Sequence, residues 1–600
     1  MLRYRSTLRT VSNFSSLGSK LRTKCSPIVN KLWHANFVRR KSCAFPILGI
    51  NGAAVSDEQL ATASGLDTLR RGGNAADAAV TMAATLQMVQ TMSCGVGGDC
   101  FAIFYDATKQ EVRCVDGSGR SPALLTLDRF LSGMKDGKIK PECTGLQATV
   151  PGAVKAWFEI INHFGSGKLH MADLFEAAIH YGEKGFPVGK WCTNEWALRQ
   201  SKLRNMHGGS TFLDRNGLVP VHGAVLRNVP LAGLLRRIAA EGIGAFYEGP
   251  VAQCIVNAVT SAGGIMTLVD LQSHMNSAEP EVLPPVSTAY RETTVHTMPL
   301  PSQGAILLEA LNILEGYDIS SFKSKPTEFY HLMIEALRLA FADGLSVVAD
   351  PEYGSTDIMI SKEHARQKRA LIDVERAMKS CAPEGLPSLH HTGTLVAAAV
   401  DAQGNACCLI GSTGLSFGCT VVSEYGFPVH SRGAAFNTLP GHPNCVGPRK
   451  KPYHTLMPVV VTDSASGRLL AVMGSQGGRM TPQALLQVIL STVDHGLDSQ
   501  EAVSKLRIQV GCIKVTLHPD DPLTAEEGID PILIESLKNK GHRLRYDPSG
   551  VAGLYMGHVS VIATDECGNG RNKESHRDRP TSNVLWCGSD PRCDGSAMTY

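Results

Sequence analysis

The chain has 600 residues, 43% of them hydrophobic and 19% charged, which excludes a fully disordered or fibrous protein. Residues 1–56 carry ten basic side chains and no acidic one, so the other 544 residues hold 48 basic and 55 acidic groups, a net charge of −7. A mildly acidic body lacks the basic surface that nucleic-acid binding requires, so we expect no nucleic-acid partner.

The first predicted segment is a basic N-terminal tail, residues 1–45. Its arginines and serines are interspersed with scattered apolar residues, which is typical of a mitochondrial presequence. The tail lacks the continuous apolar core of a secretory signal, and no apolar run of about 18 residues predicts a membrane span. We therefore expect a mitochondrial protein, and the alternative is a solvated basic tail on a cytoplasmic one.

The 17 cysteines are odd in number and scattered, without the paired spacing of a zinc or iron–sulfur site. We expect reduced thiols that pack as small apolar side chains rather than a disulfide framework. No metal ion or organic cofactor is predicted.

Two helices separated by a tight break are predicted between residues 57 and 92. Apolar residues recur every three positions from 60 to 69, and Gly72–Gly73 ends the first helix. Asn74 can cap the second helix, with Asp77 in its first turn. The second helix is apolar nearly all round, so we expect it to be buried.

Strands and helices alternate in blocks along the rest of the body. Short strands are predicted at 101–106 and 112–116, and residues 150–390 are predicted to be mainly helical. Two nearly all-apolar strands, 394–401 and 406–413, then form a hairpin around the turn AQGN. Further strands and two helices follow it, which predicts a layered α+β or α/β architecture. Residues 565–585 are predicted to be a polar inserted loop.

The junction between Gly393 and Thr394 is the first of three places where the residues indicate chemistry. A threonine that opens a buried strand after a flexible loop suits a precursor that cuts itself. Cleavage would leave the new α-amine beside the hydroxyl nucleophile, where it can act as the base. Threonine is also a common strand former, so an ordinary strand start is the alternative.

The second and third places are the segments MGSQGGRM (473–480) and GPRKKPYHTLMP (447–458). Gly477 and Gly478 follow a strand and allow backbone N–H groups to approach a carbonyl oxygen, as in an oxyanion hole. An ordinary turn is the alternative. His454 and Thr455 lie beside a basic run in a proline-bounded loop, which suits either the edge of a site or a solvated loop.

Taken together, these segments resemble one known family from about residue 50 to residue 600. The chain is similar to the γ-glutamyltransferase (glutathione hydrolase) family of N-terminal-nucleophile hydrolases. The similar segments, in the family's order, are LRRGGNAADAAV, GVGGDCF, VPGAV, PSQGAILLEALNILEGYD, EALRLAFADG, TLVAAAVDAQGNA, HPNCVGPRKKPYHTLMPVVV, GSQGGRMTPQ and GSDPRCDG. The resemblance implies an α+β fold, a four-layer αββα sandwich. Autoproteolysis would assemble it from a large fragment, 46–393, and a small fragment of 207 residues, 394–600.

The resemblance also implies a site and a reaction. Thr394 matches the family nucleophile, and Ser412 matches a hydroxyl residue that supports it. The glycine pair 477–478 matches the oxyanion hole, and His454–Thr455 occupies a serine pair that holds the substrate's α-carboxylate. Thr394 would attack a γ-glutamyl amide such as glutathione, and water or an amino-acid or peptide acceptor would resolve the ester.

Several residues depart from the family pattern. Leu395 stands where a second hydroxyl usually follows the nucleophile, and Gly414 replaces an asparagine. Arg432 and Ala435 replace the glutamine and the aspartate of the segment that binds the substrate's α-amine. The arginine that clamps the α-carboxylate is displaced by two positions, to Arg120. Loss of a carboxylate opposite an ammonium group removes a charge-assisted hydrogen bond of about 1.5–3 kcal/mol.

Three functions are therefore open. The first is a γ-glutamyl hydrolase or transferase that matures at Thr394, and the second is an acylase that cleaves another acyl amide. The third is a pseudoenzyme that binds without turnover, which the missing hydroxyl at Leu395 keeps open. The retained nucleophile and glycine pair favour chemistry. The residues expected to bind substrate are Arg120, Arg432, His454 and Thr455.

Overall fold

The computed structural model describes residues 45–277, 282–380, 393–511, 522–546, 556–564 and 584–600. Residues 1–44 of the expected presequence and residues 565–583 of the expected inserted loop lie outside these ranges, so both stay predictions. Within the described ranges, no helix is both long enough and apolar enough to cross a bilayer.

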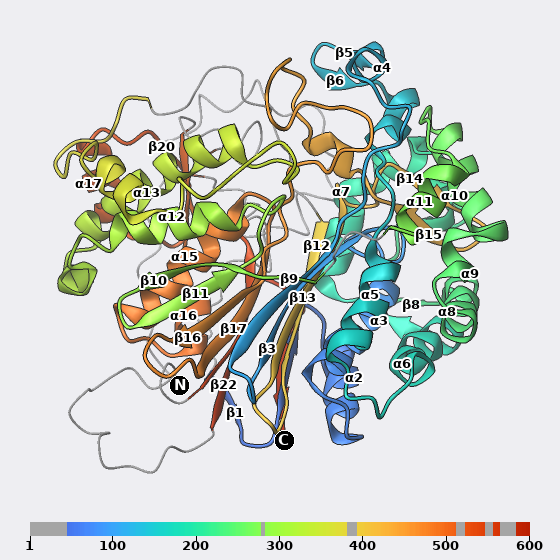
Figure 1. Cartoon of the computed structure of the whole chain (residues 1–600), viewed down its shortest axis with the longest axis horizontal. Helices are drawn as coiled ribbons and strands as arrows, with labels where there is room; N and C mark the ends of the chain where they lie inside the picture. Colours follow the sequence, from blue (N-terminus) through green and yellow to red (C-terminus); the bar gives the residue numbers. More distant parts are fainter. Residues whose placement is uncertain (1–44, 278–281, 381–392, 512–521, 547–555, 565–583) are drawn as a thin grey trace, which may run out of the picture.

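Two seven-stranded antiparallel sheets lie face to face in the middle of the molecule (Figure 1). Sheet A has the strand order β1 (Ile47–Gly49), β22 (Leu585–Ser589), β21 (His558–Thr564), β17 (Leu469–Gln476), β16 (Val459–Asp463), β11 (Thr293–Thr297) and β10 (Val286–Tyr290). Sheet B has the order β23 (Ser596–Thr599), β2 (Ala53–Ser56), β12 (Gly393–Val400), β13 (Ala406–Gly414), β3 (Asp99–Asp106), β4 (Glu111–Gly117) and β9 (Val282–Leu283).

The two sheets share one apolar layer, and helices cover their outer faces. On β12, Val396 and Val400 pack between the sheets against residues such as Val472 of sheet A. The alternate residues Leu395 and Ala397 pack outward against helices. Both faces of β12 are buried, which explains why the sequence of this strand is apolar throughout.

The outer helices complete four layers, so the predicted αββα sandwich is confirmed (Figure 1). On the side of sheet B lie α2 (Gln59–Arg70), α3 (Ala75–Val89), α5 (Ala153–Phe164), α6 (Met171–Lys184) and α8 (Val229–Glu241). On the side of sheet A lie α12 (Gly304–Leu314), α13 (Pro326–Val347), α15 (Met480–Val493) and α16 (Ser499–Ser504).

The remaining α-helices and strands of the described ranges lie outside the two central sheets. The other helices are α4 (Leu127–Ser132), α7 (Lys190–Asn205), α9 (Gly244–Tyr247), α10 (Gly249–Ser261), α11 (Leu268–Met275), α14 (Lys362–Arg369) and α17 (Pro531–Asn539). The other strands are β5 (Met134–Lys135), β6 (Lys138–Ile139), β7 (Phe186–Pro187), β8 (Val225–Leu226), β14 (Thr420–Val422), β15 (Phe427–Val429), β18 (Ile508–Gln509), β19 (Leu523–Ala525) and β20 (Leu544–Tyr546).

The local predictions near the N-terminal side of the body are confirmed. Helix α2 ends at Arg70, and Gly72 has a φ of +93°, a conformation that favours glycine. Asn74 caps α3 in a reciprocal arrangement, because its side chain accepts from the Asp77 N–H while Asp77 accepts from the Asn74 N–H at 3.0 Å. All of α3 is buried, as its sequence predicts.

Candidate active site

Three side chains lie in a row across neighbouring strands of sheet B, at the end of the β12–β13 hairpin. Thr394 pairs with Ser412 on β13, and Ser412 pairs with Asp99 on β3. Directly paired residues of antiparallel strands project from the same face of a sheet. Val396, two positions after Thr394, packs between the sheets. The row therefore faces the space between the two sheets.

The peptide bond between Gly393 and Thr394 is held by the hydroxyl of Ser412. Both residues lie at the start of β12 and are buried. Ser412 Oγ donates to the carbonyl oxygen of Gly393 at 2.6 Å and accepts from the Gly414 N–H at 2.9 Å. Thr394 Oγ1 lies 3.5 Å from Ser412 Oγ. A short hydrogen bond to the Gly393 oxygen polarises this carbonyl towards attack by the adjacent threonine.

The glycine pair after β17 has a backbone that only glycine adopts readily. The φ angles are +131° at Gly477 and +62° at Gly478. Neither N–H donates a hydrogen bond to any residue in the described ranges, so both remain available to an oxyanion. Sheet A comes very close to sheet B here, because a Cβ at Gly474 would lie 2.7 Å from Val396.

Replacing Gly477 with alanine is expected to lower the rate of amide cleavage by about 10²-fold, the size of the effect of losing one oxyanion donor. The added Cβ would lie 3.0 Å from the Gly557 Cα in a backbone conformation that alanine disfavours, so the amide would turn away. The measurement is kcat of the matured protein on a chromogenic amide.

The matched control for this variant is Gly467→Ala. Gly467 has a φ of +72° in the turn between β16 and β17, and an added Cβ there has no neighbour closer than 3.4 Å. This control variant has the same unfavourable positive φ for alanine, but the substitution lies away from the glycine pair 477–478. Equal losses of kcat in the two variants would contradict an oxyanion role for Gly477.

Asp99 is the centre of a buried ionic cluster beside the nucleophile. Its Oδ2 accepts from His430 Nδ1 at 3.0 Å, Arg432 Nε at 3.0 Å and His454 Nε2 at 2.9 Å. His430 Nε2 lies 2.8 Å from the carbonyl oxygen of Thr149, which can only accept. The hydroxyl of Thr149 also lies 3.3 Å from His430 Nε2, so His430 joins Asp99 to the backbone and side chain of Thr149. Arg432 is the guanidinium that pairs with the Asp99 carboxylate.

Burial and the neighbouring charges shift the pKa values of Asp99 and His454 in this cluster. Burial by itself would raise the pKa of Asp99, but the neighbouring His430 and His454 hold it well below its usual range. Burial, together with the Arg432 cation, lowers the pKa of His454 to about 4, so this side chain is neutral at pH 7. Its ring stacks on Phe101 with the centroids 4.3 Å apart.

Arg432 has one nitrogen left without a partner. Nη1 donates to Thr455 Oγ1 at 3.2 Å, but Nη2 has no hydrogen-bond partner among the described residues. The residue is only 2% exposed, and an unpaired buried donor costs about 1–3 kcal/mol or more when it is charged. A guanidinium held in this way is suited to binding a carboxylate.

Most of the predicted site residues belong to one connected series of contacts. Gln303 Nε2 donates to the carbonyl oxygens of Thr455, at 2.9 Å, and Gly478, at 2.8 Å. These two hydrogen bonds connect the segment that contains His454 and Thr455 to the glycine pair 477–478. The series runs through Thr394, Ser412, Asp99, Arg432, Thr455, Gln303 and Gly478, with His454 bound to Asp99.

Arg120 lies outside that series. Its Nη1 is 2.7 Å from Asp350 and its Nη2 is 2.9 Å from Glu352, and it donates to the carbonyl oxygen of Arg449 at 2.9 Å. Asp350 also accepts from the Lys451 N–H at 2.8 Å, three residues before His454. Contact between Arg120 and a substrate stays a prediction.

Sequence reasoning did not assign three residues of the site, Asp99, Gln303 and His430. Asp99 is the first residue of β3, directly after a glycine-rich turn, and Gln303 precedes the first residue of α12. The position of a polar residue where a loop meets a buried strand or helix was the one sequence feature that could have indicated Asp99 and Gln303. The residues that they contact are far away in the sequence, so no local pattern identifies those contacts.

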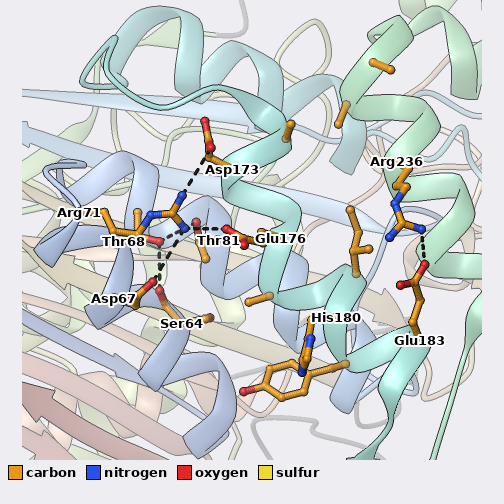
Figure 2. A pocket seen from close by; sticks show the side chains of 16 residues that line it. Ser64, Asp67, Thr68, Arg71, Thr81, Asp173, Glu176, His180, Glu183 and Arg236 are labelled. Carbon is orange, nitrogen blue, oxygen red and sulfur yellow. Dashed lines mark hydrogen bonds and ion pairs between the residues drawn. The ribbon is translucent and has the colours of Figure 1, made fainter.

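An open groove of about 960 Å³ lies in a different part of the molecule (Figure 2). Its lining comes from α2, α3, α6 and α8, and within it Arg71 binds Glu176 at 2.8 Å and Asp173 at 3.4 Å. These helices cover the outer face of sheet B, whereas Thr394 faces the opposite side of that sheet. The groove is therefore no part of the site around Thr394.

An αββα sandwich with a threonine at the head of a central strand, beside an open pair of glycine amides, defines an N-terminal-nucleophile hydrolase. Residues 61–600 match the gamma-glutamyltranspeptidase family model, and the chain belongs to this family of enzymes. Proteins of the family form heterodimers of two fragments and bind small-molecule substrates.

The proteins similar to this chain are named for different substrates. The chain is 32% identical over 561 residues to the glutathione hydrolase-like YwrD proenzyme of Bacillus subtilis, covering 92% of this chain and 99% of the relative. It is 29% identical over 558 residues to the oxamate amidohydrolase proenzyme of Klebsiella pneumoniae, covering 92% and 98%. The crystal structure of cephalosporin acylase from Bacillus halodurans matches with a TM-score of 0.81 and 29% identity, covering 93% and 97%. Family membership therefore leaves the substrate open.

Proposed function

We propose that this chain is the precursor of a threonine amidohydrolase and acyltransferase that cleaves its own Gly393–Thr394 bond and then acts on γ-glutamyl amides such as glutathione or its conjugates. The observation that carries the proposal is the 2.6 Å hydrogen bond from Ser412 to the carbonyl oxygen of Gly393, with Thr394 next to it. The resulting fragments, 46–393 and 394–600, would remain paired through the strands of sheet B.

Maturation would proceed through an ester. Thr394 Oγ1 attacks the carbonyl carbon of Gly393, the C–N bond breaks, and the nitrogen of Thr394 takes up a proton to become an α-amine. Ser412 stabilises the negative charge that develops on the Gly393 oxygen. Water then hydrolyses the ester, which leaves a carboxylate at Gly393 and restores the Thr394 hydroxyl.

Turnover would use the same threonine. The free α-amine of Thr394 takes the proton from Oγ1 as the oxygen attacks the substrate amide. The N–H groups of Gly477 and Gly478 bind the oxyanion, and the amine leaves with a proton. The acyl ester on Thr394 is then resolved by water, which gives hydrolysis, or by an amino-acid or peptide amine, which gives transfer.

A second candidate is an acylase for amides of a dicarboxylic acid that has no α-amine. The unpaired Nη2 of the buried Arg432 guanidinium suits a carboxylate. The carboxylate expected to receive an ammonium group is replaced by Ala435, and on Asp99 only Oδ1 is without a hydrogen-bond partner in the described residues, because Oδ2 accepts from three donors. Loss of the carboxylate at position 435 weakens the binding of an α-amine, which favours this candidate.

Three anilides that share one carbon framework separate the two candidates. γ-Glutamyl anilide carries both the α-carboxylate and the α-amine, glutaryl anilide lacks the amine, and pentanoyl anilide lacks both. A higher kcat/KM for the γ-glutamyl compound supports the first function, and an equal or higher value for the glutaryl compound supports the acylase. Hydrolysis of none of them by a matured protein would contradict both.

Replacing Arg432 with methionine is expected to lower kcat/KM for the preferred carboxylated anilide by about 10–100-fold more than for pentanoyl anilide, since one or two charge-assisted hydrogen bonds are lost. The ratio of the two losses is the measurement, because general damage to the site would affect both substrates equally. Equal losses would show that Arg432 does not bind the substrate's carboxylate.

A further inference from the structure

A second group of reactive side chains lies beside the proposed active site. Asp57 follows β2, His558 opens β21, and Cys593 lies between β22 and β23. One potential ligand atom from each residue lies within 4.8 Å of those of the other two. A carboxylate, an imidazole and a thiol thus converge from three distant segments of the chain.

Two of these residues have buried polar atoms without a partner. Asp57 is 0% exposed and His558 is 1% exposed. In the described part of the chain, neither Asp57 Oδ1 nor His558 Nε2 has a hydrogen-bond partner. The remaining polar atom of each side chain is engaged. Asp57 Oδ2 accepts from the Val396 N–H at 2.8 Å, and His558 Nδ1 contacts the side-chain amide of Gln476.

We propose that Asp57, His558 and Cys593 bind a divalent transition-metal ion, with Zn²⁺ as the ion that their chemistry fits best. Zinc takes oxygen, nitrogen and sulfur ligands in tetrahedral sites, and three protein ligands leave a fourth position for water. A carboxylate and a thiolate carry two negative charges and the imidazole is neutral, so a 2+ ion balances the site.

The surroundings support such a site. No cation in the described ranges forms an ion pair with Asp57, and the nearby carboxylate of Asp590 is already neutralised by Arg507 at 2.8 Å and Arg592 at 3.0 Å. Cys593 is partly buried, and its Sγ has one weak hydrogen bond, to the carbonyl oxygen of Asp590 at 3.4 Å, which a metal ion would replace. Binding would displace the proton of the Cys593 thiol into solvent, because zinc binds the thiolate.

Gln476 would act as the outer partner of the histidine. With Nε2 on the metal, Nδ1 carries the ring proton and donates to the side-chain oxygen of Gln476, the usual arrangement around a ligating histidine. The assignment of oxygen and nitrogen in a side-chain amide is chosen from its hydrogen bonds, so this orientation is compatible with the observed contact.

The ion would connect the two halves of the active site. Asp57 holds the backbone of Val396, two residues after Thr394, whereas His558 pairs with Gln476, the residue before Gly477. A metal bound between them would link the strand that carries the nucleophile to the strand that leads into the oxyanion loop. It would also link the two fragments, because Asp57 precedes the proposed cleavage point and its two partners follow it.

Metal content of the full-length protein tests this site. After expression with added zinc and extensive dialysis, elemental analysis is expected to give about one zinc per chain. Cys593→Ser is expected to reduce the content to below about one tenth, and His558→Gln to do the same. Cys254→Ser, which changes a partly buried cysteine of α10 outside the cluster, is the matched control and should retain the metal.

Cobalt substitution adds a readout that depends on the thiolate. Co²⁺ added to the metal-free protein is expected to produce a near-ultraviolet thiolate-to-cobalt absorption band, which Cys593→Ser should abolish. Folding of each variant is checked by circular dichroism. A folded wild-type protein that retains no zinc and gives no cobalt band would overturn the proposal and would assign the space to a buried water that bridges Asp57 and His558.

The outcome does not depend on the proposed enzymatic function. Thr394→Ala, which cannot mature, is expected to bind the same amount of zinc as the wild-type chain, because Thr394 contributes no ligand. If the wild-type chain binds zinc and Thr394→Ala does not, the proposed set of ligands is contradicted, because Thr394 is not one of them. Failure of maturation in a zinc-loaded wild-type chain would instead contradict the proposed function.

Discussion

Replacing Thr394 with alanine is expected to leave the chain as a single band and to lower amide hydrolysis by about 10⁴–10⁶-fold, the effect of removing a covalent nucleophile. The alanine lacks the oxygen that attacks Gly393, so no α-amine is released. It also lacks the oxygen that attacks the substrate. Denaturing gels with N-terminal sequencing measure the first effect, and anilide hydrolysis measures the second.

Thr394→Ser is the matched control, because it keeps the hydroxyl and removes only a methyl group. We expect this variant to split into two fragments, the smaller beginning at residue 394, and to retain measurable turnover. Cleavage of the alanine variant at the same bond would disprove the assignment of the nucleophile. A wild-type chain that stays intact through long incubation would disprove the proposed maturation.

Replacing Ser412 with alanine is expected to slow self-cleavage by about 10²–10³-fold, the range for loss of one donor to a developing oxyanion. Ser412 Oγ donates to the Gly393 oxygen at 2.6 Å, and no other side chain in the described part of the protein donates to that oxygen. The rate at which the two fragments appear from freshly purified precursor is the measurement.

Ser416→Ala is the control for that experiment. Ser416 is buried and its hydroxyl lies close to Gly393, but it bonds Glu195 at 3.4 Å rather than the carbonyl oxygen of the cleavage site. We expect its maturation rate to stay within a fewfold of wild type. Equal slowing of both variants, or a normal rate for Ser412→Ala, would contradict the role given to Ser412.

Local patterns were sufficient to predict the elements that surround the site. The break at Gly72, the cap at Asn74 and the β12–β13 hairpin all follow from residues within a few positions of one another. Periodicity, capping and turn chemistry act over that range, so they can be recognised without knowing the fold. The family resemblance then supplied the αββα arrangement and the position of Thr394.

The substrate side of the site was harder to predict. Arg432 and His454 were expected to contact a substrate, but their common partner, Asp99, lies more than 300 residues earlier in the chain. Arg120 binds Asp350 and Glu352, two partners that the sequence did not indicate, and its contact with a substrate stays a prediction. Which acid neutralises which base depends on strand order and loop packing, and side-chain type alone does not determine it.

Composition and local patterning established the charge split between tail and body and the buried hairpin, and the family resemblance predicted the nucleophile and the oxyanion donors. The fold was needed to show that Ser412 reaches the Gly393 oxygen and that Arg432 has an unpaired nitrogen. It also decided that Asp57, His558 and Cys593 converge. The physical reason is that helix and turn formation depend on near neighbours. The pairing of two sheets, in contrast, brings together side chains that no local spacing relates.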